Sequence, residues 1–267
     1  MNSIEAVVKE LRENGVGDIT SSKLRKMLVK EVVKEYIDVA KQRGIRYVGF
    51  TDHLGRYTPP SIYRDLRDIL KSTEPGPVEF YVGAEVELLD VSGKIVVDED
   101  YLKGRIDYLI AGLHHYNYFS PPAGDVEEIV EFVFKEIIGA INNPLVDALA
   151  HPWTRALKRV AERTGVELRF SDFPEELIYR SFEEAKRRNK PVQIVFRPEW
   201  VSSNVDERLA GVETMYRAIV ETECPVFYGS DTHSPAGLGG MAKEAYKYFK
   251  SLGANLPVWL PVKKWCC

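Results

Sequence analysis

The stretch KEYIDVAKQRGIRYVGFTDH, residues 34–53, joins a helical pattern to a short apolar run and ends on a histidine. The helical pattern begins at Ser21 or Ser22, either of which can cap it, and Gly44 ends it. A strand is expected directly afterwards, over 45–50. The helical assignment rests on apolar side chains that share one face, namely Leu24, Leu28, Val32, Tyr36 and Ala40.

The same alternation recurs along the rest of the 267-residue chain. Helices are expected at 61–71, 102–105, 126–142, 174–188, 209–222 and 239–252. Short apolar runs predict six strands, at 45–50, 79–89, 107–113, 144–150, 191–196 and 225–230. A seventh, poorly hydrophobic strand is expected at 16–20, after an N-terminal helix.

Alternating helices and strands indicate a parallel sheet covered by helices. This length suits either a (β/α) barrel or a doubly wound sheet. No linker, charge block or repeat divides the sequence, so one domain over residues 1–267 is the simplest interpretation. Two tryptophans near the C-terminus, Trp259 and Trp265, are expected to pack on the barrel rather than on a partner.

Composition narrows the classes of function. The chain is 45% apolar, and 36 Lys and Arg against 40 Asp and Glu give a net charge of −4, which supplies no general attraction for nucleic acid or anionic lipid. No apolar run approaches the ~20 residues of a membrane helix, and Glu5 and Glu10 stand where a signal peptide would be apolar, so a cytoplasmic location is expected. The three cysteines, Cys224, Cys266 and Cys267, lack the spacing of a metal site.

Polar residues follow the predicted strands at their carboxyl ends. All five histidines lie just past such an end. In a parallel barrel these ends converge on one rim, whereas a doubly wound sheet would spread most of them along an edge. Convergence therefore favours the barrel. The residues concerned are His53, Glu85, His114, His115, His151, Asp231 and His233.

Imidazoles and carboxylates meeting at a rim are the usual ligands of Zn, Mn or Fe. Such a metal lowers the pKa of bound water and so favours hydrolysis. Each residue also has an ordinary structural interpretation, because a single histidine after a strand is more often a loop hydrogen-bonder. Glu87 is an alternative to Glu85 on the same strand face, and His115 could merely face solvent beside His114. Arg197 binds a substrate anion or forms a surface ion pair.

These residues together resemble the polymerase and histidinol phosphatase (PHP) family, whose members are distorted barrels of seven strands. The resemblance runs from about Glu31 to Leu252, through the motifs FTDH (50–53), GAEVEL (83–88), DYLIAGLHH (107–115), ALAHP (148–152) and YGSDTHSP (228–235). It implies a bridging role for Glu85 and two neighbouring metals for Asp231 and His233. The metal ligands that it implies are His53, Glu85, His114, His151, Asp231 and His233.

The chain departs from the family at its beginning. Members open with a strand that carries H-x-H, but here no histidine precedes His53. Aligning the opening pattern puts Thr20 and Ser22 at the H-x-H positions, unless a mis-assigned start codon hides a true H-x-H. The expected outcome is one firm metal site of Glu85, His114 and His151. A second, weak site would use His53, His233 and water. The Glu-Ile-Asn of the family's sixth strand is replaced by QIV (193–195).

The resemblance implies a metal-dependent phosphoesterase in which metal-activated water attacks phosphorus. Arg197 would neutralise phosphate charge, and His115 or His233 would protonate the leaving oxygen, with Asp231 beside them in the catalytic set. The substrate is expected to be a small phosphomonoester such as histidinol phosphate, or a nucleotide or oligonucleotide end, and the net acidity favours the small one. The oligomeric state is left open.

Two other functions compete with the phosphoesterase. A degenerate, metal-poor PHP domain would act as a binding or assembly module, because three histidines of the family are missing. A related metal-dependent barrel would hydrolyse C–N bonds. That class needs a carboxylated lysine or an equivalent bridging ligand, and no lysine follows a middle strand here.

Overall fold

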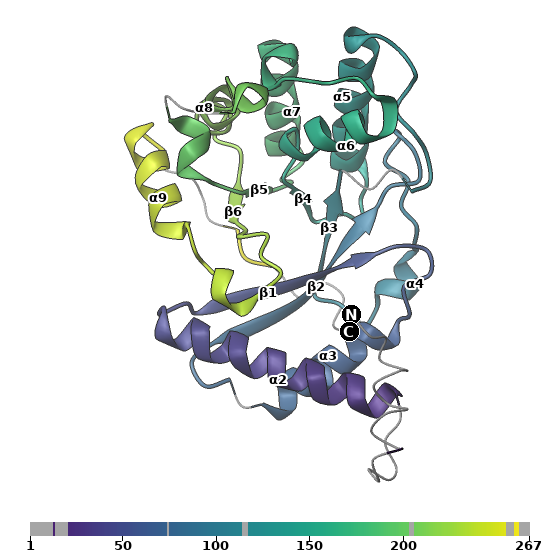
Figure 1. The fold of residues 1–267 in the computed structure, drawn as a ribbon, viewed down its shortest axis with the longest axis vertical. Coiled ribbons are helices and arrows are strands. Elements are labelled where there is room, and N and C mark those ends of the chain that lie inside the picture. Colours follow the sequence, from purple (N-terminus) through teal and green to yellow (C-terminus); the bar gives the residue numbers. More distant parts are fainter. Residues whose placement is uncertain are drawn as a thin grey trace.

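The computed structural model describes residues 13, 21–73, 75–113, 117–202, 206–254 and 259–261. Within them, six strands form one sheet in which each strand pairs in parallel with the next one along the chain. The sheet curls into a half-barrel (Figure 1). Because the strand order never reverses, the barrel-type winding expected from the sequence is confirmed. The strands are β1 (Tyr47–Leu54), β2 (Glu79–Glu87), β3 (Tyr108–Gly112), β4 (Ala148–Ala150), β5 (Val192–Ile194) and β6 (Val226–Tyr228).

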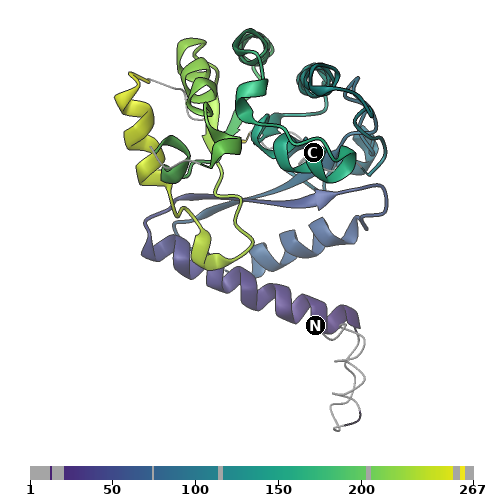
Figure 2. The same cartoon turned by 45° about the horizontal axis from the view of Figure 1, so that its top comes forward.

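Helices cover the outer face of the curled sheet (Figures 1 and 2). Among the described residues, no helix is long and apolar enough to cross a membrane. Short 3₁₀ turns lie at Phe170–Asp172 (η1), Pro198–Val201 (η2), Glu207–Leu209 (η3) and Pro235–Gly237 (η4). The helices are α2 (Ser21–Gln42), α3 (Ser61–Ser72), α4 (Glu99–Leu102), α5 (Val126–Asn142), α6 (Thr154–Thr164), α7 (Glu175–Arg187), α8 (Glu213–Glu221) and α9 (Ala242–Ser251).

The main core lies between the sheet and these helices. Side chains alternate along a strand, so Val82, Ala84 and Val86 of β2 face the helices and are buried there. The intervening residues of β2, including Glu85 and Glu87, face the inside of the half-barrel. The alternation therefore turns two carboxylates away from the main core and towards the barrel interior.

The inside of the half-barrel is filled by aromatic rings at the level below these carboxylates. Gly49 and Gly83 make room for the Tyr108 ring, because a Cβ at Gly83 would lie 2.3 Å from Tyr108 Cζ. Trp259 packs on the same ring, with 5.9 Å between ring centroids. The backbone N–H of Trp259 donates to the Val226 carbonyl at 2.9 Å. The expectation that Trp259 packs on the barrel is confirmed.

Some sequence-based boundaries were wrong. The strand expected at 45–50 continues to Leu54, so His53 lies inside β1 rather than after it. The run 144–150 contains a strand of only three residues. Helix α6 was not expected at all. Ser22 lies in the first turn of α2, whereas Thr20 and the strand expected at 16–20 lie outside the described residues.

Candidate functional site

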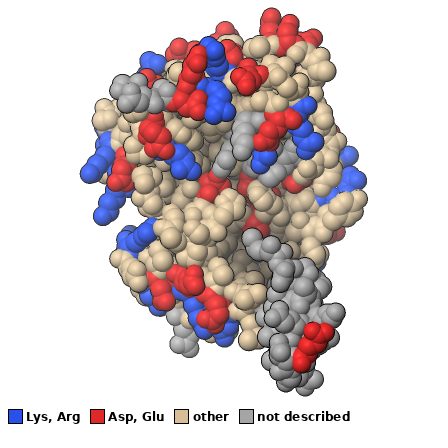
Figure 3. Space-filling model, viewed as in Figure 1, with Lys and Arg blue, Asp and Glu red and all other residues tan. Residues whose placement is uncertain are grey.

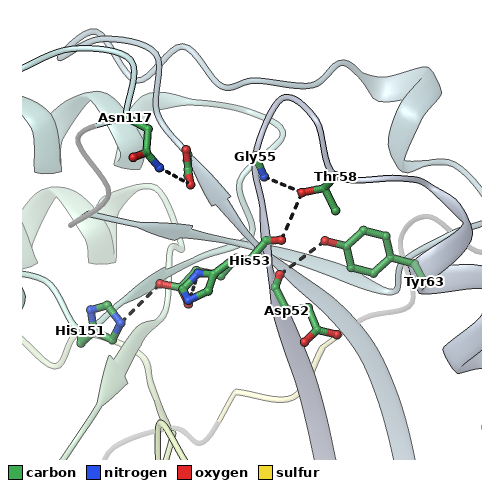
Figure 4. A network of polar contacts seen from close by, with 9 residues as sticks. Asp52, His53, Gly55, Thr58, Tyr63, Asn117 and His151 are labelled. Atoms are coloured by element: carbon green, nitrogen blue, oxygen red, sulfur yellow. Dashed lines mark hydrogen bonds and ion pairs between the residues drawn. The ribbon is translucent and has the colours of Figure 1, made fainter. Parts of the chain in front are cut away.

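Glu85 lies between two imidazoles at the carboxyl end of the half-barrel. The two imidazoles are those of His53 and His151 (Figure 4). His53 and Glu85 are register partners on β1 and β2, and His151 directly follows β4. Glu85 Oε2 lies 3.6 Å from His53 Nδ1, and Glu85 Oε1 lies 3.4 Å from His151 Nε2. The side chains of Glu85 and His151 are 7% and 3% exposed, whereas that of His53 is 47% exposed. The group thus opens to solvent on the His53 side.

Gly112 makes room for the Glu85 carboxylate. A Cβ at Gly112 would lie 2.3 Å from Glu85 Oε1, closer than any real contact of that kind. Gly112 is the last residue of β3, the strand paired with β2, so the glycine and the carboxylate lie side by side on neighbouring strands. Of the two glutamates on this strand face, Glu85 is the one that contacts both imidazoles.

Backbone strain marks the ends of β4 and β6. His151 and Asp231 have φ angles of +29° and +49°, and Trp153 has a φ of +68°. Positive φ is uncommon for residues other than glycine and is found preferentially at functional sites. Asn189 and Glu223 also have positive φ, so two of the five such non-glycine residues described are predicted metal ligands.

Glu87, the last residue of β2, belongs to a second polar group that sequence reasoning did not identify. Its Oε1 accepts a hydrogen bond from Asn117 Nδ2 at 2.8 Å (Figure 4), while its Oε2 is buried and makes no hydrogen bond with any described residue. Asn117 precedes Tyr118, whose hydroxyl accepts from the Arg56 N–H at 2.6 Å. The only sequence signal for this group was the second acid of the motif GAEVEL.

Asp52 precedes His53 in β1, but its carboxylate points away from the imidazole (Figure 4). The side chains of neighbouring strand residues alternate between the two faces of the sheet, which accounts for this opposite direction. Burial raises the pKa of the Asp52 carboxyl, and the nearby His53 acts in the opposite direction. Asp52 therefore lies outside the Glu85 group.

A cavity of about 430 Å³ adjoins His151. Arg197, which follows β5, lines the same cavity, so the structure brings this predicted anion-binding residue next to a predicted metal ligand. The Arg197 residue is exposed. Among the described residues, no carboxylate lies within ion-pair distance of its guanidinium. This leaves the guanidinium available to an anion in the cavity.

The remaining predicted residues are placed less fully. His114 and His115 lie outside the described residues. Asp231 and His233 lie in the loop after β6, with Asp231 half-buried and His233 exposed. His233 makes none of the contacts that join His53, Glu85 and His151.

The donors of the Glu85 group suit a divalent metal by type. Two imidazoles and a carboxylate are common ligands of Zn and Fe. Each Glu85 oxygen faces one imidazole, which gives two separate donor pairs. Within the described ranges, no group of three or more His, Cys, Asp or Glu side chains is arranged to hold a metal ion. A third donor near one of these pairs would complete a site.

Comparison with known proteins gives relatives over part of the chain. No protein-family model matches it. A "Probable phosphatase" from Caldanaerobacter subterraneus subsp. tengcongensis is 36% identical over 117 residues, which are 42% of this chain and 42% of the relative. A "Probable phosphatase" from Caldicellulosiruptor bescii is 30% identical over 124 residues, 45% of this chain and 47% of the relative. The chain thus spans less than half the length of these two relatives.

A solved structure matches over most of the chain. The histidinol phosphate phosphatase of Lactococcus lactis subsp. lactis Il1403, solved with zinc, L-histidinol and phosphate, superposes with a TM-score of 0.56 at 13% identity. The superposition covers 86% of this chain and 91% of that chain. At this identity the likeness concerns the fold: the present chain shares its half-barrel architecture with that protein.

Proposed function

We propose that this chain is a metal-dependent phosphoesterase of the PHP type, formed by one domain over residues 1–267, which hydrolyses a small phosphomonoester. The observation that carries the proposal is the Glu85 carboxylate held between His53 and His151 at the carboxyl end of a parallel half-barrel. The partial relatives named as probable phosphatases, and a fold neighbour solved with zinc and phosphate, support the same reaction class.

His53, Glu85 and His151 would hold the metal, with His114 as the further imidazole and Asp231 and His233 as ligands of a second ion. A Zn, Mn or Fe ion, when bound, supplies a Lewis acid and a water of lowered pKa. Each Glu85 oxygen lies beside one nitrogen of these two imidazoles, so the carboxylate and each imidazole would supply donors to the same ion.

The other proposed roles belong to residues near the scissile bond. Arg197 binds the phosphate oxygens through its planar guanidinium and offsets their charge as the bond to the leaving oxygen breaks. His233 or His115 gives a proton to that oxygen, so that the product leaves as a neutral alcohol.

A second function has one observation in its favour. No group of three or more donor side chains is arranged to bind metal in the part of the chain that the structure describes. A non-catalytic binding module of the same fold would need no complete metal site.

Elemental analysis and a phosphatase assay separate the two functions. Protein purified without chelator should retain a divalent metal and hydrolyse phosphomonoesters, and His151→Ala should lower kcat/KM by at least about 100-fold because a buried metal ligand is lost. Circular dichroism should show that the variant is folded. Tyr246→Ala, a change at a residue that is 65% exposed on α9, is the control and should retain activity.

Metal-free, inactive wild-type protein would contradict the phosphoesterase and favour the binding module. Full activity of a folded His151→Ala variant would show that the chemistry takes place elsewhere.

A further inference from the structure

We propose that the cavity beside His151 holds the leaving group of the substrate, and that this group is a compact and mainly apolar organic moiety. The inference rests on the proposed phosphoesterase function and adds the class of substrate to it. The substrate is then a small-molecule phosphomonoester with an aromatic or branched aliphatic body, rather than a sugar phosphate or the end of an oligonucleotide.

The cavity adjoins the place where the phosphate would bind. His151 and Arg197 both line it, and they follow the neighbouring strands β4 and β5. A phosphate bound by Arg197 beside the Glu85 group would therefore have the cavity as its neighbour. The rest of a phosphomonoester has to lie in some space next to its phosphate, and this cavity supplies that space.

The size and the lining of the cavity suit a small, mainly apolar group. At about 430 Å³, the cavity falls within the range of roughly 300–1,000 Å³ typical of small-molecule sites. Apolar side chains line much of it, and such surfaces gain free energy by removing apolar ligand surface from water. These side chains are Leu157, Ala161, Leu168, Val195, Trp200 and Leu209.

A short turn fixes Arg197 and Trp200 relative to each other. The backbone N–H of Trp200 donates to the Arg197 carbonyl at 3.0 Å, and η2 lies between Arg197 and Ser202. Trp200 is half-buried and packs on the main core. The turn thus presents a cation for phosphate and an aromatic wall for the attached group to the same cavity.

The charges around the cavity argue against a polyanion. Arg208 is already paired with Asp206 at 2.8 Å, and Glu162 with Arg159 at 2.7 Å. Arg197 is therefore the cation of the lining that carries no ion pair among the described residues. A nucleic-acid strand requires several cations along its backbone. Figure 3 shows Lys and Arg interspersed with Asp and Glu over the visible face.

The experiment compares 2-naphthyl phosphate with methyl phosphate as substrates of the metal-loaded protein. Wild type should prefer the naphthyl ester in kcat/KM. Trp200→Ala should lower the ratio of the two kcat/KM values roughly tenfold or more, chiefly through a higher KM for the naphthyl ester, because an apolar wall is lost. Trp200→Phe keeps an aromatic wall and should restore most of the ratio, and Tyr246→Ala should leave it unchanged.

Direct binding of 2-naphthol, measured by equilibrium dialysis, separates failure of this inference from failure of the proposed function. Hydrolysis of both esters with a ratio unchanged in Trp200→Ala would overturn the cavity assignment and leave the phosphoesterase intact. Hydrolysis of neither ester by wild type would overturn the phosphoesterase. Binding of 2-naphthol that depends on Trp200 would then still support an apolar ligand site, and absence of such binding would overturn that as well.

Discussion

The interior of the half-barrel has two levels that the same strands build in opposite ways. At the lower level, which we call the floor, Gly83 accommodates the ring of Tyr108. At the upper level, which we call the rim, Gly112 accommodates the carboxylate of Glu85. Both levels need a glycine on one strand to admit a large side chain from its neighbour. The floor fills space with rings, whereas the rim gathers ionisable groups that partly face solvent.

The comparison indicates that residues important for stability and residues important for activity lie only two positions apart on the same strand. Gly83 and Glu85 are adjacent inward-facing residues of β2, one at each level. A change at the floor should therefore act mainly on folding, and a change at the rim mainly on activity.

The largest effect is expected at the rim. Glu85→Gln removes the negative charge between His53 and His151, and we expect kcat/KM for a phosphomonoester to fall at least about 100-fold, with little change in the thermal unfolding temperature. Steady-state kinetics and calorimetry measure the two quantities. Glu87→Gln, on the same face of the same strand, is the matched control and should lose much less activity. Equal losses in both variants would mean that the two carboxylates share one role.

The next effect is expected at the floor. Gly83→Ala places a Cβ 2.3 Å from Tyr108 Cζ, and overpacking of this kind costs about 1–3 kcal/mol in the free energy of unfolding. For a chain of this size each kcal/mol lowers Tm by roughly 2–4 °C. Thermal denaturation should show the loss, while kcat of the folded fraction changes little.

Gly112→Ala is the matched change at the rim. Its Cβ would meet the end of the flexible Glu85 side chain instead of a packed ring. Activity should therefore fall more, and Tm less, than in Gly83→Ala. If the two variants lost Tm and activity in the same proportion, the separation of floor and rim would be wrong.

The smallest effect is expected at Cys224, which lies before β6, at the end of the half-barrel opposite the rim. Burial raises the pKa of this thiol from its ordinary value of 9.0 to about 12. Because the folded-state pKa is the higher one, the contribution of Cys224 to stability is present below pH 9 and is lost as the pH rises towards about 12. Iodoacetamide at pH 8 should therefore leave Cys224 unmodified in native protein and alkylate it in urea, as peptide mass spectrometry would show.

The winding of the fold and the Glu85 group could be predicted because both follow from local patterns. Asp125 caps α5, where it accepts a hydrogen bond from the Glu128 N–H at 3.0 Å, and the apolar spacing gave the bounds of this helix, 126–142. Strand ends of a parallel sheet share one edge, which was enough to bring His53 and His151 towards Glu85.

Other features depend on contacts that the sequence does not display. Helix α6 begins after Trp153, whose φ is +68° and which makes no side-chain cap hydrogen bond, so no start signal precedes it. Glu85 and Glu87 share a strand face, and their contacts distinguish them: Glu85 lies beside the two imidazoles, whereas Glu87 accepts a hydrogen bond from Asn117. The shared cavity of Arg197 and His151 likewise depends on residues brought together from α6, β5 and the turn η2.

The hydrogen bond from the backbone N–H of Trp259 to the Val226 carbonyl covers part of the edge of the sheet. β6 is a terminal strand, and an uncovered terminal strand offers backbone groups to another chain. Trp259 occupies part of this edge and covers the Tyr108 ring of the floor. A chain shortened to Ala254 would lose that shield, so we expect it to self-associate through β6 and to precipitate before it loses its helices.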